Sequence, residues 1–243
     1  MPLHHRCHLF GLLVGALAIG GVHGAEPEAY ALDPVHTRVL VAVEHAGFSR
    51  ALGTASGSTG YLWFTPDDLA RTRWDITLPL ARLDFGDAKW NAAVQASQLL
   101  DARRHPDARF VSTVVTAIDA HHARACGDLT LRGVTAPLCL DVTVNVVKRH
   151  PLPPFRRTAG LSATGTLSRK AFGLEAWPNV IGDTVELRIE AEAVRSGNGE
   201  PASAPDTPAV PDRPTVPDPA DGPSAGSSGL RTSAEPTTQA SRR

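Results

Sequence analysis

The chain of 243 residues carries 24 Lys and Arg against 25 Asp and Glu, which leaves a formal net charge of −1 at pH 7. This near-neutral balance lacks the basic footprint of a nucleic-acid-binding protein, so we expect no nucleic-acid partner. Between an apolar leader and a polar tail, residues 27–195 are long enough for one domain with a sizeable core.

The first residues are typical of a secretory signal peptide. An apolar run from Leu9 to Val22 follows Arg6. The run is shorter than the roughly 20 residues that a membrane-spanning helix needs, and a short membrane anchor is the alternative. We predict that residues 1–24 are a signal peptide, cleaved after Gly24 or Ala25, and that the mature protein is periplasmic.

Two strands with alternating apolar side chains are predicted next. In the first, over residues 30–45, the three valines of residues 39–43 share one face, and the alternation places His45 on the same face. The second covers residues 53–64. Its glycines, Gly60 among them, predict a bulge or a close approach of two backbones.

A third strand and a helix follow. Residues 74–80 alternate between apolar and other side chains, which predicts a strand. A helix is expected to begin after Asp87, a suitable N-cap, with an apolar stripe at helical spacing over residues 90–100. Pro106 ends this segment. Residues 109–118 return to strand, although their apolar side chains fall on both faces.

The clearest pattern lies in residues 127–146, which read as two amphipathic strands joined by a turn. With the turn placed at residues 134–135, Cys126 and Cys139 share a face but stand four residues apart along it. That offset is on the order of 13 Å, whereas a disulfide needs Cα atoms within about 7 Å. We therefore predict two free thiols.

The remaining segments complete an all-β domain. Residues 159–167 form a weak strand, residues 169–177 a turn, and residues 185–191 an alternating last strand. About eight antiparallel strands with one helix favour a closed barrel or a sandwich. Residues 196–243 contain no aromatic residue and a single Leu, so we predict a disordered Pro/Ala/Ser/Thr-rich tail.

The sequence contains no established catalytic pattern. Within the predicted domain of residues 27–195, a Gly-rich phosphate loop, a Walker motif and a GxSxG elbow are all absent. Its histidines form no H-x-H or H-E-x-x-H pair, so no metal site is expected. His45 has two interpretations: a polar group that orients a ligand head at a cavity mouth, or a core or rim histidine that bonds to backbone. The aromatic side chains are either plain core or a ligand cage.

Several segments together resemble the YceI family of exported lipid- or polyisoprenoid-binding proteins. Residues 30–37, YALDPVHT, are similar to the family's opening Y-x-L-D-x-x-H-[ST]. Residues 99–113 resemble its F-F-D…Y-P…F-x-S-T stretch. Residues 127–140 are similar to G-D-L-T-x-x-G-V-T-x-P-V-x-L, and residues 168–174 and 182–187 resemble the closing motifs. The resemblance runs in order over about residues 29–195 and excludes the tail.

The resemblance implies an antiparallel, lipocalin-like β-barrel that holds an isoprenoid chain in its interior. We therefore expect a binding or carrier protein for a long polyisoprenoid or related lipid, such as a quinone tail, and not an enzyme. No cofactor is expected besides this ligand. Transient membrane contact for loading and a homodimer are further expectations about partners. One alternative is an exported hydrolase that pairs His45 with a carboxylate and a hydroxyl. Another is a filled-core barrel that acts as an interaction module.

The expected ligand-binding residues combine the valine face, the helix stripe and the aromatic side chains. They are Val41, Val43, His45, Phe64, Trp74, Leu78, Trp90, Val94, Phe110, Phe172 and Trp177. The sequence departs from the family where the helix begins, because Trp90-Asn91 and Ala93-Val94 replace an Arg-Asp and a His-Leu pair. This edge is therefore more apolar than in the family.

Overall fold

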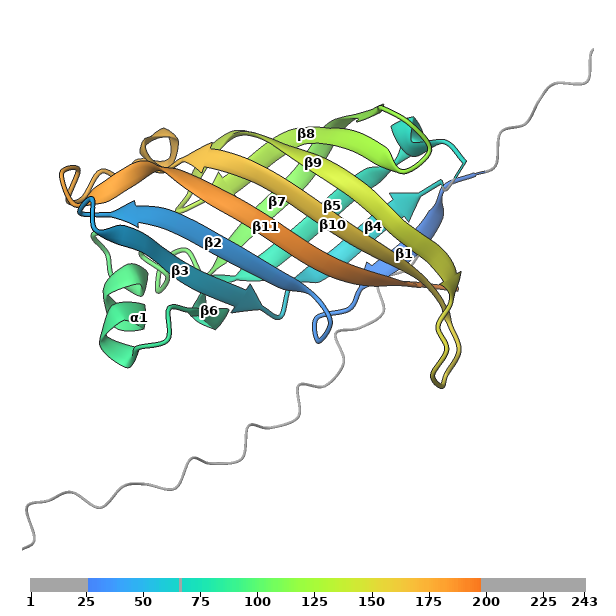
Figure 1. Cartoon of the computed structure of the whole chain (residues 1–243), viewed down its shortest axis with the longest axis horizontal. Helices are drawn as coiled ribbons and strands as arrows, with labels where there is room; N and C mark the ends of the chain where they lie inside the picture. The colour runs from blue at the N-terminus through green and yellow to red at the C-terminus, as the bar shows by residue number, and fades with distance from the viewer. Residues whose placement is uncertain (1–25, 66, 198–243) are drawn as a thin grey trace, which may run out of the picture. The chain divides into compact units, whose positions relative to one another are not determined.

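The computed structural model describes residues 26–65 and 67–197, and these form one antiparallel β-barrel with a single α-helix (Figure 1). The prediction of an all-β, antiparallel barrel is confirmed. The predicted leader and the tail beyond Gly197 lie outside the described residues. The strands are β1 (Glu28–Leu32), β2 (Arg38–His45), β3 (Ser49–Ser56), β4 (Thr59–Phe64), β5 (Arg73–Pro79), β6 (Leu83–Asp84), β7 (Asp107–Ala117), β8 (His122–Leu131), β9 (Val134–Arg149), β10 (Arg157–Ser168) and β11 (Ile181–Arg195).

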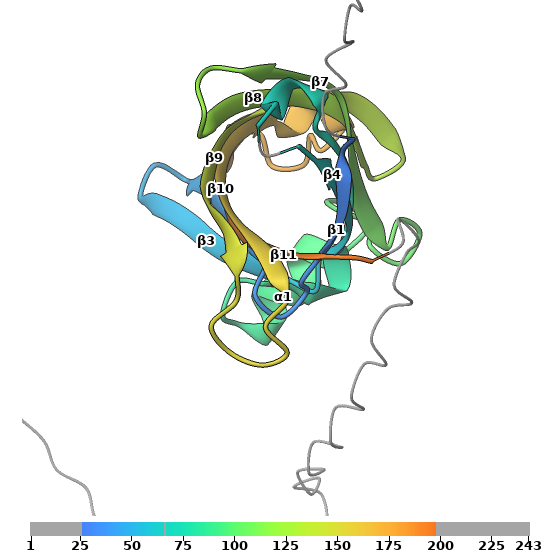
Figure 2. The same ribbon diagram turned by 90° about the vertical axis from the view of Figure 1, so that its right-hand side faces the viewer.

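The barrel closes because two consecutive strands share one long neighbour. β2 pairs with the first part of β11 and β1 pairs with its end, so β1 and β2 together follow β11 as one bent strand. β3 and β4 pair with β2 and β1 in the same way. With β5 and β7 to β11, these two bent strands make eight barrel strands, and Figure 2 looks along the barrel.

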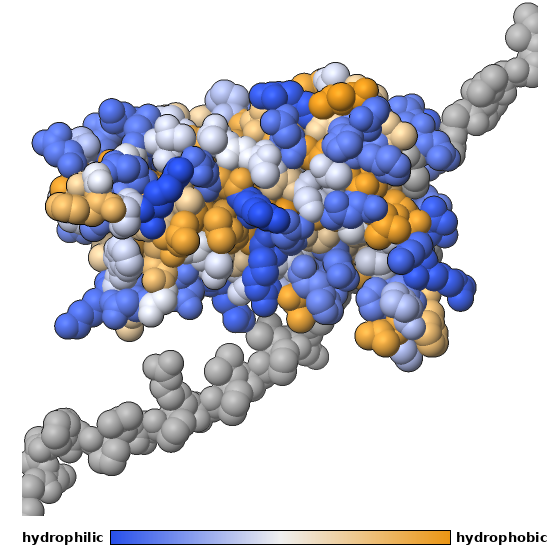
Figure 3. Space-filling view, viewed as in Figure 1, coloured by the Kyte–Doolittle hydropathy of each residue, from blue (hydrophilic) through white to orange (hydrophobic). Residues whose placement is uncertain are grey.

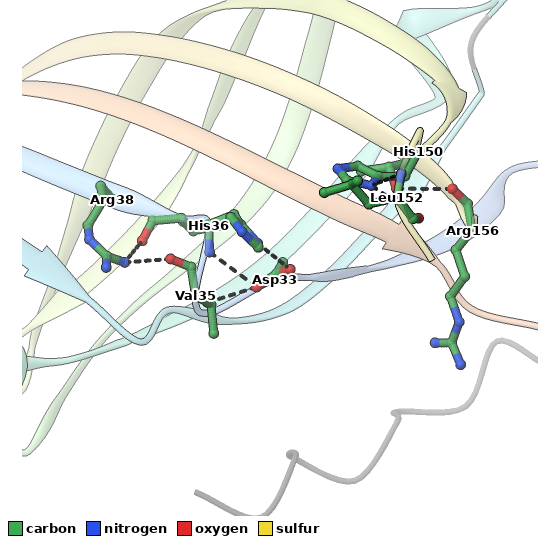
Figure 4. A network of polar contacts seen from close by, with 9 residues as sticks. Asp33, Val35, His36, Arg38, His150, Leu152 and Arg156 are labelled. Carbon is green, nitrogen blue, oxygen red and sulfur yellow. Dashed lines mark hydrogen bonds and ion pairs between the residues drawn. The ribbon is translucent and has the colours of Figure 1, made fainter. Parts of the chain in front are cut away.

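A polar turn makes the bend between β1 and β2, where the sequence pattern predicted one continuous strand. Asp33 Oδ1 accepts hydrogen bonds from the backbone N–H groups of Val35 (2.8 Å) and His36 (3.2 Å). The ring Nδ1 of His36 lies 2.9 Å from Asp33 Oδ2. Figure 4 shows this turn and, apart from it, the β9–β10 loop, in which the Leu152 N–H donates to His150 Nδ1 at 3.2 Å.

Glycine makes the matching bend between β3 and β4. The expected single strand over residues 53–64 is interrupted at Gly57, whose φ is 77°. The predicted close backbone approach is confirmed at Gly60, where a Cβ atom would lie 2.1 Å from the carbonyl oxygen of Asp75. A larger residue at this position would push β4 away from β5.

The single α-helix, α1 (Ala88–Gln95), begins where the sequence predicts and ends earlier. Asp87 caps it by accepting hydrogen bonds from the backbone N–H groups of Lys89 and Trp90. After Gln95 the chain turns back, and the N–H of Leu100 donates to Val94 O at 3.1 Å. α1 lies at one end of the barrel, beside β3 and β6 (Figure 1). No helix among the described residues is long and apolar enough to cross a membrane.

The prediction of free thiols is wrong, because the hairpin turns two residues earlier than expected. Arg132 and Gly133 both have positive φ angles, 52° and 74°, and form a two-residue turn that pairs Leu131 with Val134. In this register Cys126 lies directly opposite Cys139, with a Cα–Cα distance of 4.0 Å, and a disulfide joins them.

Alternation between the two faces builds the interior, and β-bulges explain its exceptions. The register of β7 against β8 shifts between Ser112 and Val114, so Phe110 and Val115 both face inward. Because of this bulge, apolar residues of 109–118 that would fall on opposite faces of a regular strand point to the same side. The outer surface mixes hydrophilic side chains with separate apolar patches (Figure 3).

Candidate functional site

The barrel encloses an apolar cavity of about 520 Å³, a size typical of sites for small organic ligands. Aliphatic and aromatic side chains from nearly every barrel strand form its wall. Among the described residues, four polar side chains other than the indoles join the lining: Thr37, His45, Ser58 and Arg169.

Nine of the eleven predicted site residues line this cavity. They are Val41, Val43, His45, Trp74, Leu78, Trp90, Val94, Phe110 and Trp177. Phe64 and Phe172 do not line it, although both are almost fully buried. Phe64 packs edge-on against Tyr30 with the ring centroids 5.8 Å apart, so it belongs to the filled end of the barrel.

Strand β2 lines the cavity along its whole length. Because alternate residues face the same side of a strand, Val39, Val41 and Val43 form an apolar row between Thr37 and His45. Thr37 and His45 are eight positions apart in the chain, which corresponds to about 26 Å of extended strand. The lining therefore has a polar group at each end of a long apolar row.

The cavity opens toward α1. Four residues line it and are also exposed: Trp90 and Ala93 of α1, and Trp177 and Val180 of the loop before β11. This loop is tied to the β2–β3 turn, since the N–H of Ala46 donates to Val180 O at 2.6 Å. The ring of His45 lies 5.7 Å from that of Trp90. We call these exposed side chains, together with His45, the mouth.

The opposite end of the cavity is closed. Leu32, Leu62, Trp74 and Phe110 line it there and are buried, and the rings of Trp74 and Phe110 contact each other at 6.4 Å. Tyr30, which is fully buried, pairs with Leu62 and packs against Phe64 at this end of the barrel. A ligand that enters at the mouth would therefore reach a floor and not a second opening.

Arg169 lies in the wall near the mouth, and sequence reasoning missed it. Its side chain is 3% exposed and donates Nε–H to Gly182 O (2.9 Å), an Nη2 hydrogen to Ile181 O (2.8 Å) and an Nη1 hydrogen to Leu174 O. Ile181 pairs with His45, which places the guanidinium at the mouth end. These bonds hold together the loop that carries Trp177 and Val180. A charged residue within the motif of residues 168–174 was the available signal.

Sequence reasoning also missed Thr37 and Ser58 in the wall away from the mouth, and it named Trp74 there only as an aromatic side chain, without its indole N–H. Thr37 and Ser58 are each 1% exposed and Trp74 is 9% exposed. Thr37 Oγ1, Ser58 Oγ and Trp74 Nε1 have no hydrogen-bond partner among the described residues. The only sequence signal for Thr37 and Ser58 was the position of Thr37 at the end of the opening motif.

The geometry gives no support to the hydrolase alternative. Within residues 26–65 and 67–197, the ring nitrogens of His45 make no hydrogen bond to a carboxylate or a hydroxyl. The same residues contain no cluster of three or more His, Cys, Asp or Glu that could hold a metal ion. The cavity itself argues against a filled-core interaction module.

Comparison with known proteins agrees with the barrel and its motifs. The YceI-like domain matches residues 30–193, which cover almost the whole barrel. The chain belongs to the YceI family. The chain is also similar to two UPF0312 proteins, one from Pseudomonas savastanoi pv. phaseolicola and one from Pseudomonas syringae pv. syringae. Each is 30% identical to it over 188 residues, which cover 75% of this chain and 96% of the relative.

Solved structures share the fold of this YceI-family chain at low sequence identity. BcnA of Burkholderia cenocepacia superposes with a TM-score of 0.60 at 22% identity, covering 67% of this chain and 99% of its own. The YceI protein of Campylobacter jejuni gives 0.55 at 22% identity, with coverages of 62% and 88%. A polyisoprenoid-binding domain from Saccharophagus degradans gives 0.50 at 14% identity, with coverages of 70% and 99%.

Proposed function

We propose that the protein binds a long-chain polyisoprenoid or related lipid in the barrel and carries or sequesters it, without catalysing a reaction on it. The observation that carries this proposal is the apolar cavity, closed at Trp74 and open at the mouth. A structural neighbour described as a polyisoprenoid-binding domain adds support from the family.

The energetics of burial agree with a ligand that offers little besides hydrocarbon. Burying one CH₂ group contributes roughly 0.8 kcal/mol, so a five-carbon isoprene unit contributes about 4 kcal/mol at most. Micromolar affinity corresponds to about 8 kcal/mol. Ordering of the chain and incomplete burial offset part of the gain. Two or three well-buried units are therefore enough, and no dense array of polar contacts is required.

Native mass spectrometry tests the proposal on protein purified, without detergent, from the bacterium that makes it. We expect a bound adduct whose mass and fragments identify an isoprenoid chain. If the protein carries no lipid and takes up none when mixed with polyisoprenoids, the proposal is contradicted.

The proposed site of action is the periplasm. The leader pattern of residues 1–24 supports export, and the Cys126–Cys139 disulfide agrees with an oxidising compartment. Intact mass of the periplasmic protein should begin at Ala25 or Glu26. A product that retains the apolar run from Leu9 to Val22 would contradict export by a cleaved leader.

Loading from a membrane at the mouth completes the proposal. Phe48, at the tip of the β2–β3 turn, is 92% exposed, and Trp177 and Val180 extend the apolar surface around the opening. Exposed aromatic side chains are suited to the membrane interface. Phe48→Ser should slow uptake from vesicles, whereas Phe155→Ser in the β9–β10 loop should not. Equal slowing by both variants would contradict loading at the mouth. The homodimer stays a prediction.

A further inference from the structure

We propose that the inner part of the cavity, lined by Thr37, Ser58 and Trp74, binds the head group of the ligand, and that this head is uncharged and carries oxygen. The inference rests on the proposed function and specifies the class of ligand: an isoprenoid alcohol, ketone or quinone. The ligand then lies with its head at the floor and its hydrocarbon tail toward the mouth.

Hydrogen-bonding capacity is the first step of the argument. Thr37 Oγ1, Ser58 Oγ and Trp74 Nε1 belong to residues that line the cavity, are buried, and have no partner among the described residues. A buried polar group without a partner costs free energy, which a ligand atom can recover by bonding to it. The surrounding lining is hydrocarbon, so these groups mark where a polar ligand atom fits.

The fold places the two hydroxyl groups on neighbouring segments. Arg38 pairs with Ser56, and the N–H of Gly57 donates to Pro34 O at 3.3 Å, so the bend before β2 lies beside the bend before β4. Thr37 and Ser58 occupy these two bends. Trp74 is on β5, the next strand beyond β4, where it pairs with Leu62. The three groups therefore come from one side of the barrel wall, away from the mouth.

The chemistry of the three groups selects the head. A hydroxyl donates or accepts, and an indole N–H only donates, so each of the three groups can donate to a ligand oxygen that accepts hydrogen bonds. A diphosphate or carboxylate would need a cation as well. Among the described lining residues the permanent cation is Arg169, which lies at the mouth end and already donates to three backbone carbonyls. A charged head is therefore disfavoured at the inner end.

Three C20 probes with the same tail test the proposal: geranylgeraniol, geranylgeranyl diphosphate, and the corresponding hydrocarbon without a head. Each is titrated into the wild-type protein and into the Thr37→Val, Ser58→Ala double variant. Thr65→Val is the matched control, because Thr65 is equally buried and its hydroxyl is also unpaired, but it does not line the cavity.

We expect the wild-type protein to bind the alcohol most tightly. The double variant should bind the alcohol about tenfold more weakly, which is the loss expected for two neutral hydrogen bonds, and should bind the hydrocarbon as before. Thr65→Val should change neither affinity. The melting temperature of the empty double variant should be equal to or above that of the wild type, because no bond within the protein is lost.

Three results would overturn the inner head site. They are unchanged alcohol affinity in the double variant, tightest binding of the diphosphate by the wild type, and a lower melting temperature of the empty double variant. In each of these cases the protein still binds isoprenoids. If the wild-type protein binds none of the three probes, the proposed function itself fails, which is a separate outcome.

Discussion

At the scale of single residues, Arg169 shows how a buried charge shapes the mouth. We expect Arg169→Met to lower the free energy of unfolding by about 2–4 kcal/mol, because it leaves the carbonyls of Leu174, Ile181 and Gly182 without their donor. Urea denaturation measures this change. Arg188→Met, on the exposed face of β11, is the control and should cost less than about 1 kcal/mol. Equal costs would show that the buried guanidinium has no special role.

The turn between β1 and β2 has a pH dependence whose sign follows from its pair of charges. The hydrogen bond and charge of Asp33 raise the pKa of His36 above its ordinary value. For Asp33, burial acts upward, but hydrogen bonds from the His36 ring and from two backbone N–H groups outweigh it and lower the pKa. The His36 contribution to stability is thus complete below pH of about 6.5 and is lost as the pH rises through the folded-state pKa.

NMR titration of the His36 ring measures this pKa directly. In Asp33→Asn the midpoint should move down toward the ordinary histidine value of about 6.5. The other histidine resonances act as internal controls and should keep their midpoints. A His36 midpoint that does not move in the variant would show that Asp33 does not hold the ring.

At the scale of elements, the β8–β9 hairpin shows that alternation predicts the strands but not the register between them. Alternation identified both strands and, as far as Val144, their inward faces, because period two is a property of each strand alone. The register of β9 against β10 shifts after Val144, so Val146, which the alternation placed inside, is exposed. Register depends in addition on the turn, and Arg132-Gly133 forms a two-residue turn that the prediction placed at residues 134–135. Because of that error, the predicted register placed Cys126 and Cys139 four residues apart.

The disulfide is checked by alkylation of denatured protein. Without a reductant, neither Cys126 nor Cys139 should react, and after reduction both should. Labelling of both cysteines in unreduced mature protein would restore the prediction of free thiols and would contradict the register in which they face each other.

Helix α1 is predicted to guard the mouth. Val94 lines the cavity, so Val94→Trp should narrow the opening and weaken uptake of a fluorescent isoprenoid by about tenfold or more, with unchanged far-UV circular dichroism. Ala92→Trp adds the same side chain at an exposed position of the helix that does not line the cavity, and should leave uptake unchanged. Unchanged uptake in a folded Val94→Trp protein would mean that α1 does not border the entry route.

At the scale of the whole molecule, the barrel and nine of the eleven expected cavity residues could be predicted from periodicity together with the family motifs. The cavity itself could not, because an inward-facing side chain such as Phe64 or Phe172 can equally fill the core. Whether such a side chain lines a cavity or fills the core depends on how many side chains meet at one level of the barrel. Arg169 and Ser58 were missed for a related reason. At the end of a strand, the alternation no longer indicates whether a polar side chain faces the interior or the solvent.

The central claim, that the apolar interior binds an isoprenoid chain, is tested most directly by filling that interior. Val41→Trp adds volume in the middle of the valine row, and Leu40→Trp adds the same side chain to the outer face of the same strand. The measurement is equilibrium uptake of a fluorescent polyisoprenoid by the two folded variants and the wild type. We predict that the wild type and Leu40→Trp bind it and that Val41→Trp loses most of the affinity. Equal binding by all three proteins, or none by the wild type, would contradict the claim.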